Sequence, residues 1–286
     1  MEAPSKKRSA IAEVWRRLKK NKLAVISLFV IILLFLVALT APIIAPYAYS
    51  EQHSEKAFAP SSREFLLGTD RLGRDIFSRL IYGSRQSLML GLISIFFAAV
   101  LGIFIGAIAG FYGRWTDNLL MRLLDIYQSI PMLLLCITLS AILGPSLRNA
   151  IIALSVSMMP QFARLMRASI LTVREMEYID AARTVNSSNT HIIIHEIIPN
   201  AISPLIVTIT MQIGGCILVG SMLSFIGLGV QPPNPEWGTM ISDARDYMRS
   251  HITLALYPGI CIMITVLAFN LLGDGLRDAL DPRLKD

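Results

Sequence analysis

The chain has 286 residues, of which 54% are hydrophobic in type and only 16% are charged, and its net charge at pH 7 is +6. A soluble globular domain is about 25% charged, so this composition excludes a soluble enzyme, a disordered chain and a secreted disulfide scaffold. Residues 1–22 hold eight basic and two acidic side chains, whereas residues 23–286 are neutral overall. Because no basic stripe runs through the body of the chain, the charge does not indicate a nucleic-acid partner.

The chain begins with a basic segment, residues 1–22, followed by an apolar stretch. Apolar side chains recur at helical spacing in the basic segment: Ile11, Val14, Trp15 and Leu18. This spacing predicts a short amphipathic helix on the anionic inner leaflet of a membrane, so we expect membrane lipid as a partner. About 20 apolar residues span a bilayer, and residues 23–50 carry no charge. We therefore expect a first transmembrane helix over residues 23–46, too long for a cleaved signal peptide.

A segment with charges of both signs, residues 47–85, separates this helix from the rest of the chain. The next uncharged stretches are residues 86–113, 126–147, 149–163, about 203–226, and 250–273. The stretch 149–163 is short, so it spans a membrane only if Arg148 and Arg164 reach towards the interfaces. The sequence thus predicts an all-α integral membrane protein with six transmembrane helices, the last five of them within residues 86–275.

Six spans place both termini on one side of the membrane. Lys and Arg are enriched on the cytoplasmic side, and an inside N-terminus puts 17 of the 26 Lys and Arg residues there. We therefore expect residues 1–22 and the tail 276–286 to be cytoplasmic and residues 47–85 to be extracytoplasmic. The six basic residues between Lys56 and Arg85 run against this bias.

The apolar stretches contain no predicted metal centre. The three cysteines, Cys136, Cys216 and Cys261, lack CxxC spacing, and the four histidines lie outside the apolar centres without an HExxH pattern. Asp125 lies at the edge of a span, where an ion pair with Arg122 is expected. The scarcity of other intramembrane charges disfavours an ion-coupled transporter.

The chain also lacks a nucleotide-binding motif. No GxxxxGK[ST] loop occurs in it. We expect a chain that is not an enzyme and binds no cofactor of its own.

The segment 170–200 reads as two helices. The first is expected from Thr172 to Val185, and Asn186 ends it because Asn tolerates a left-handed backbone. Ser187, Ser188 and Asn189 provide capping side chains for the second helix, which continues to Pro199.

The segment 65–88, FLLGTDRLGRDIFSRLIYGSRQSL, is the second informative one. Thr69 or Asp70 is expected to cap a short amphipathic helix. Its apolar residues Ile76, Leu80 and Ile81 are expected to face the membrane or a partner. Both a structural plug and a substrate contact are consistent with this pattern.

These segments resemble the permease subunits of bacterial ABC importers. Asp180-Ala181-Ala182 lies where that family has Glu-Ala-Ala in its EAA loop, and Ile198-Pro199 lies at the Leu-Pro position. Asp180 replaces Glu, and Asn186 replaces the usual Gly. The signature LGTDxxGRDxxSRxxxG, typical of the peptide and nickel branch, is matched by Asp70, Gly73, Arg74, Asp75, Ser78 and Arg79. Residues 224–238 are also similar to that branch.

The resemblance implies a type I ABC importer permease fold, the second (C-type) permease of a pair, in a bacterial cytoplasmic membrane. Its implied partners are a homologous permease, two ATPase subunits that bind ATP and Mg²⁺, and an extracytoplasmic binding protein. The implied ATPase-coupling residues are Glu177, Asp180, Ala181, Ala182, Asn186 and Pro199. The implied cargo is a dipeptide or oligopeptide; a nickel or metal chelate, or ion-coupled transport, are the alternatives.

Overall fold

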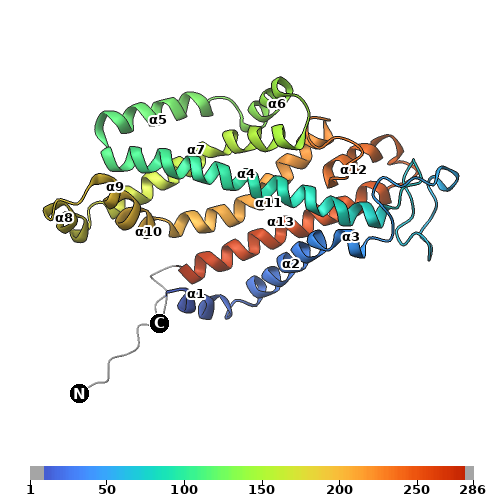
Figure 1. Cartoon of the computed structure of the whole chain (residues 1–286), viewed down its shortest axis with the longest axis horizontal. Coiled ribbons are helices and arrows are strands. Elements are labelled where there is room, and N and C mark those ends of the chain that lie inside the picture. The colour runs from blue at the N-terminus through green and yellow to red at the C-terminus, as the bar shows by residue number, and fades with distance from the viewer. Residues whose placement is uncertain (1–9, 281–286) are drawn as a thin grey trace, which may run out of the picture.

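The computed structural model describes residues 10–280, which form helices joined by loops (Figure 1). The predicted features that fall on residues 1–9 and 281–286 lie outside this range. Five long helices lie lengthwise in a bundle: α2 (Lys22–Leu39), α4 (Ile76–Tyr112), α7 (Leu147–Val173), α11 (Ser203–Phe225) and α13 (Thr253–Leu280). The all-helical class is as the sequence predicts.

Four helices in the described part of the chain, α2, α4, α11 and α13, are long and apolar enough to cross a membrane. A fifth span is reached if α5 (Arg114–Gln128) and α6 (Met132–Leu143) count as one broken span. The predicted count of six requires that α7, which contains the expected stretch 149–163, also crosses the membrane. α7 is 27 residues long but less apolar than the others.

The predicted span 126–147 is not one helix. α5 ends at Gln128, α6 begins at Met132, and the two axes differ by 82°. Pro131 at the start of α6 explains the break, because proline lacks the N–H donor of a continuous helix and disfavours a helical conformation at the residue before it.

α4 and α7 pack closely along their lengths. Gly102, Gly106 and Gly110 recur every four residues on α4, and Phe162, Ala163 and Ile170 of α7 lie directly against them. A Cβ at Gly106 would lie 2.3 Å from the backbone oxygen of Ala163. Small residues at this spacing allow the backbones of two neighbouring membrane helices to approach each other closely. The sequence analysis did not identify this stripe.

The remaining elements gather at the two ends of the bundle. One end carries α8 (Glu177–Thr184), α9 (Asn189–His191), a π-helical turn (Ile192–Ile197) and α10 (Ile198–Ala201). The other carries α3 (Ala41–Ile44), the 3₁₀ turns Ser54–Lys56 and Arg245–Tyr247, and α12 (Trp237–Ala244). We call these the α8 end and the α12 end. α1 (Ala10–Leu18) packs on α13 and lies towards the α8 end, as does the last turn of α13 (Figure 1).

Candidate functional site

At the α8 end, the segment after α7 folds into a small helical unit. α7 continues to Val173, so the next helix begins at Glu177 and not at Thr172 as expected. The reason is that the buried side of α7 extends through Ile170 and Val173, both packed in one core cluster. The chain therefore leaves the helix only at Arg174.

The break at Asn186 is present as predicted. Asn186 has a φ of +58°, and the backbone N–H groups of Asn186 and Ser187 donate to carbonyl oxygens of Arg183 and Ala182 (2.9 and 3.1 Å). These bonds satisfy the last carbonyls of α8. The hydroxyl of Ser188 then accepts from the N–H of His191 at 3.3 Å and caps α9.

Most of the expected coupling residues are accessible. The exposed ones are Glu177, Asp180, Ala181, Asn186 and Pro199, and Ala182 is half-buried against the core. Pro199 lies in the first turn of α10, apart from the other five. Asp180 pairs with Arg183 at 3.3 Å, so this carboxylate is directed along α8.

α8 is held to the bundle on one side only. Ile179 is fully buried and packs in one cluster with Ile192 and Ile197. Large apolar side chains remain exposed on and beside the helix: Met176 (47%), Tyr178 (40%) and Val185 (75%). Burial, and then Glu196, raise the pKa of Tyr178. A rigidly anchored helix with an apolar and charged free face is typical of a protein-docking surface.

At the α12 end, the first signature residues form a capped helix start. The carboxylate of Asp75 accepts from the N–H of Ser78 at 2.8 Å and caps α4. The expected cap at Thr69 or Asp70 is therefore wrong. Asp70 forms a turn instead, where one carboxylate oxygen accepts from the N–H groups of Leu72 and Arg74 (2.9 and 3.0 Å).

The helix that follows is neither short nor turned outward. It runs without a break from Ile76 to Tyr112, ten residues longer at its start than the expected span 86–113. Ile76 and Ile81 are buried, and Leu80 packs against the cluster around Trp237. Ile76 and Leu80 therefore face the protein interior and not the membrane, because they pack in one cluster with residues of α12.

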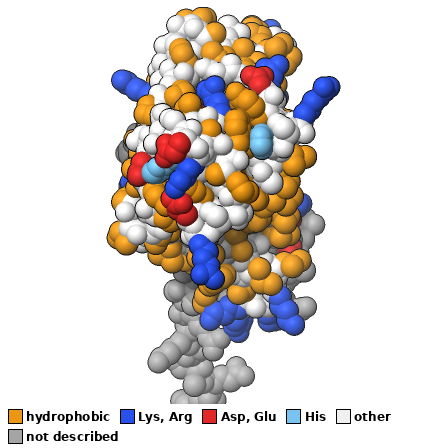
Figure 2. Space-filling view, turned by 90° about the vertical axis from the view of Figure 1, so that its right-hand side faces the viewer, with side chains coloured by type: hydrophobic (Ala, Val, Ile, Leu, Met, Phe, Trp, Pro, Cys, Tyr) orange, Lys and Arg blue, Asp and Glu red, His pale blue; other side chains and the backbone are white. Residues whose placement is uncertain are grey.

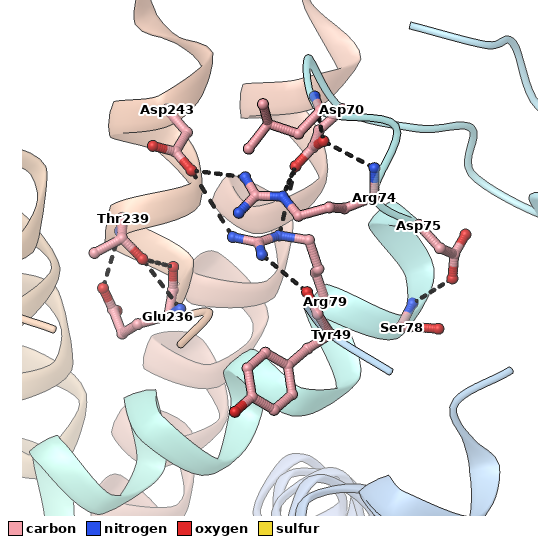
Figure 3. A network of polar contacts seen from close by, with 10 residues as sticks. Tyr49, Asp70, Arg74, Asp75, Ser78, Arg79, Glu236, Thr239 and Asp243 are labelled. Atoms are coloured by element: carbon pink, nitrogen blue, oxygen red, sulfur yellow. Dashed lines mark hydrogen bonds and ion pairs between the residues drawn. The ribbon is translucent and has the colours of Figure 1, made fainter. Parts of the chain in front are cut away.

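Two buried arginines and two carboxylates form a network beside this helix start (Figure 3). Arg74 donates to Asp70 at 2.6 Å and to Asp243 of α12 at 3.2 Å. Arg79 lies 3.7 Å from Asp70 and 3.8 Å from Asp243, and donates to the carbonyl oxygen of Tyr49 at 3.1 Å. Both arginine side chains are at most 5% exposed. Removing one partner from such a buried network costs about 3–5 kcal/mol.

The other two signature residues hold the segment 47–75 in place. The hydroxyl of Ser78 accepts from the N–H of Tyr47 at 3.1 Å. Gly73 has a φ of +71°, and a Cβ there would lie 1.9 Å from the carbonyl oxygen of His53. Only glycine fits this close turn.

A second buried carboxylate joins α12 to two long helices. Glu236 is fully buried and accepts from the hydroxyls of Ser87 on α4 (3.0 Å) and Ser221 on α11 (3.1 Å). It also caps α12 through the N–H of Thr239 at 3.0 Å. The indole of Trp237 donates to the carbonyl oxygen of Leu80 at 3.1 Å.

The geometry at the α12 end favours a structural role for the signature residues. The cavity beside Asp70, Arg79 and Asp243 has a volume of about 20 Å³, which is room for a water molecule and not for a peptide. The surface of this end carries acidic and basic side chains between apolar ones (Figure 2). Lys56 and Glu64 of the segment 47–75 form an exposed ion pair at 2.5 Å. Sequence analysis missed Asp243 and Glu236, because Arg74 lies 169 residues from Asp243 in the chain and Ser87 lies 149 residues from Glu236.

Asp125 pairs with Arg164 at 2.8 Å and not with Arg122, because the side chain reaches the neighbouring helix α7. Within residues 10–280, no group of three or more His, Cys, Asp or Glu side chains is placed to hold a metal ion.

The family becomes clear on comparison with known proteins. Residues 102–286 match the family described as the inner membrane component of binding-protein-dependent transport systems. Residues 9–60 match the N-terminal transmembrane domain of oligopeptide transport permease C. The chain therefore belongs to the family of inner-membrane components of binding-protein-dependent ABC transport systems.

Relatives cover nearly the whole chain. It is 45% identical over 273 residues to the dipeptide transport system permease protein DppC of Alkalihalophilus pseudofirmus, covering 96% of this chain and 90% of that one. It is 43% identical to the di/tripeptide permease protein DppC of Pseudomonas aeruginosa (97% and 94% covered). It is 40% identical to the glutathione permease protein GsiD of Pectobacterium atrosepticum (96% and 91% covered).

The fold is similar to a solved transporter. An inward-facing structure of the MetNI methionine ABC transporter superposes with a TM-score of 0.58 at 20% identity, covering 72% of this chain and 98% of that one. The permease fold expected from the sequence is thereby confirmed.

Proposed function

We propose that this chain is the C-type transmembrane subunit of an ATP-driven importer that moves dipeptides or oligopeptides into the bacterial cytoplasm. The observation that supports this most strongly is the similarity, over more than nine-tenths of the chain, to permeases named for dipeptides, di/tripeptides and glutathione. Glutathione is itself a small peptide. Its partners in this proposal are a second permease, two ATPase subunits that bind ATP and Mg²⁺, and a binding protein outside the membrane.

The α8 segment is the proposed contact with the ATPase. Ile179 fixes the helix to the bundle, while Met176, Tyr178 and Val185 remain exposed on the free face. The small side chain of Ala181 allows a partner to approach closely, and Glu177 and Asp180 offer carboxylates to basic groups. When the ATPase subunits close on ATP, α8 moves with them, and the long helices rock so that the pathway opens outward. ATP hydrolysis returns the helices to the inward-open arrangement.

The orientation follows from the charges. α1 and α8 lie towards the same end of the bundle (Figure 1), so an inside N-terminus also places α8 in the cytoplasm and residues 47–75 outside. A reporter fused after His191 is expected to read as cytoplasmic, and one inserted at Lys56 as extracytoplasmic. The opposite pattern contradicts this orientation.

The coupling role is tested by a substitution on the free face of α8. Ala181→Arg is expected to abolish uptake of labelled dialanine by cells that lack other peptide permeases, because the long side chain blocks close docking. Membrane levels of the protein stay unchanged, since Ala181 is exposed. Ala181→Ser, which keeps the side chain small, is the control and retains uptake. Normal uptake by Ala181→Arg contradicts the coupling role.

The nickel or chelate alternative predicts a different result in the same cells. Uptake of ⁶³Ni²⁺ would then depend on this chain and dialanine would not compete. No metal-binding group in residues 10–280 supports that reading.

A further inference from the structure

An exposed ion pair lies on the side of the bundle. The Asp125 carboxylate on α5 accepts from the Arg164 guanidinium on α7 at 2.8 Å. The Asp125 side chain is 65% exposed and that of Arg164 is 45% exposed. This pair belongs neither to the hydrophobic core nor to the network at the α12 end.

The pair lies at the edges of the expected spans 126–147 and 149–163. Phe162 and Ala163, next to Arg164 in the chain, pack against Gly102 and Gly106 of α4, which lie inside the uncharged stretch 86–113. Charges exposed on the side of a membrane-spanning bundle are costly against hydrocarbon, so such side chains face water or another protein.

Further polar side chains lie beside a groove on this side of α7. The groove has a volume of about 710 Å³ and is lined by residues of α7 and α11, among them Leu165, Ala168 and Thr208. Residues four apart share one face of a helix, so Gln161, Arg164 and Gln212 lie one turn beyond the groove, on the side away from the α8 end. Gln161 and Gln212 are hydrogen-bonded to each other at 2.5 Å. We call Asp125, Gln161, Arg164 and Gln212 the polar face.

The chain is also interrupted beside this face. α5 ends three residues after Asp125, and the chain bends by 82° before α6. Broken membrane helices in transporters commonly mark a substrate pathway.

We propose that the polar face is the wall of the translocation pathway on this subunit and that Arg164 and Asp125 bind the two charged ends of a peptide in transit. This inference rests on the function proposed above. A free peptide carries a carboxylate and an ammonium group, which match the guanidinium and the carboxylate of the pair. The side-chain amides of Gln161 and Gln212 can replace the hydrogen bond between them with hydrogen bonds to the backbone of the transported peptide. The ion pair closes the site when no peptide is present and opens by exchanging partners.

A photocross-linking experiment on the assembled transporter tests the occupant of this face. Leu165 is replaced by the photoreactive residue benzoylphenylalanine, and radiolabelled dialanine, the binding protein and ATP are supplied. The expected result is radiolabel on this chain, reduced about tenfold by Arg164→Gln or Asp125→Asn. Arg148→Gln, which removes an exposed arginine at the other end of α7, is the matched control and leaves labelling unchanged. Cross-links to the second permease alone, without peptide labelling, overturn the proposal.

Transport by the same variants separates this inference from the function it rests on. At low dialanine concentration, Arg164→Gln and Asp125→Asn are expected to lower the uptake rate about tenfold through a higher KM, while Arg164→Lys, which keeps the charge, recovers at least a third of the rate. Unchanged uptake by both charge-removing variants overturns the inference and leaves the peptide importer intact. No peptide uptake by the unsubstituted complex overturns both.

Discussion

The close contact between α4 and α7 predicts the effect of adding one methyl group to the protein. In Gly106→Ala the new Cβ lies 2.3 Å from the carbonyl oxygen of Ala163 and 2.8 Å from the Cβ of Met166. Ordinary contacts begin near 3.4 Å, so the two backbones must separate by roughly 1 Å in a closely packed interior.

The magnitude follows from two opposing terms. Overpacking of a rigid contact costs about 1–3 kcal/mol, whereas replacing Gly by Ala inside a helix gains up to about 1 kcal/mol. Because the blocking atom is a backbone oxygen, the overpacking cost lies at the upper end, so the net loss is about 2 kcal/mol, which lowers the unfolding midpoint by about 4–8 °C.

The assay is thermal unfolding of the purified permease in detergent, followed by size-exclusion chromatography of the fraction that stays monodisperse. Gly259→Ala in α13 is the matched control, because its Cβ meets no atom within 4 Å. That variant is expected to unfold at the same temperature or a higher one. If Gly106→Ala is as stable as Gly259→Ala, the inferred close packing of α4 and α7 is refuted.

Three further substitutions test the ends of the bundle. Glu236→Ala should lower the unfolding free energy by about 3 kcal/mol, since the hydroxyls of Ser87 and Ser221 lose their acceptor and α12 loses its cap. In the thermal assay, a smaller loss of stability for Glu236→Ala than for Glu236→Gln contradicts this prediction. Asp70→Asn should cost about 3 kcal/mol in the same assay, because two buried arginines lose a charged partner, and an unchanged midpoint counts against the network. Asn186→Gly should retain uptake. Asn186→Val places a branched side chain at a φ of +58°, so it should increase proteolysis of the α8 segment. Equal protease sensitivity of the two variants contradicts a strained turn at this position.

Local features of the fold could be predicted from the sequence. The apolar stretches gave the positions of α2, α11 and α13, since length and composition decide what crosses a membrane. Asn186 and Ser188 end and begin helices through their own side chains and backbone preferences, which act over a few residues. For the same reason, the order helix, break, helix in 170–200 agrees with the structure, although the first helix begins at Glu177 and the second helical stretch continues past Pro199 to Ala201.

Several features were not predicted, for local as well as long-range reasons. The helix start at Asp75 was assigned to Thr69 or Asp70, because the turn that Asp70 forms with Leu72 and Arg74 was not recognised. The break at Pro131 was overlooked inside a long apolar stretch that hydropathy alone treats as one span. Asp125 was paired with its near neighbour Arg122, whereas the partner that tertiary structure provides is Arg164.

The sequence identified only some of the residues that form the buried network at the α12 end. The signature residues were identified by resemblance, but Asp243, which accepts a hydrogen bond from Arg74 and forms an ion pair with Arg79, carried no local signal. Its partners lie at the start of α4 and in the turn before it, so only the packing of α12 on that region reveals the network (Figure 3).

The central claim, ATP-driven peptide import through this subunit, is tested most directly by transport into proteoliposomes. The vesicles hold this chain, its partner permease and the ATPases, with ATP inside and the binding protein and labelled dialanine outside. The account predicts dialanine accumulation that requires ATP and the binding protein, persists when proton and sodium gradients are collapsed, and disappears with Ala181→Arg. Accumulation that follows an ion gradient without ATP would contradict it.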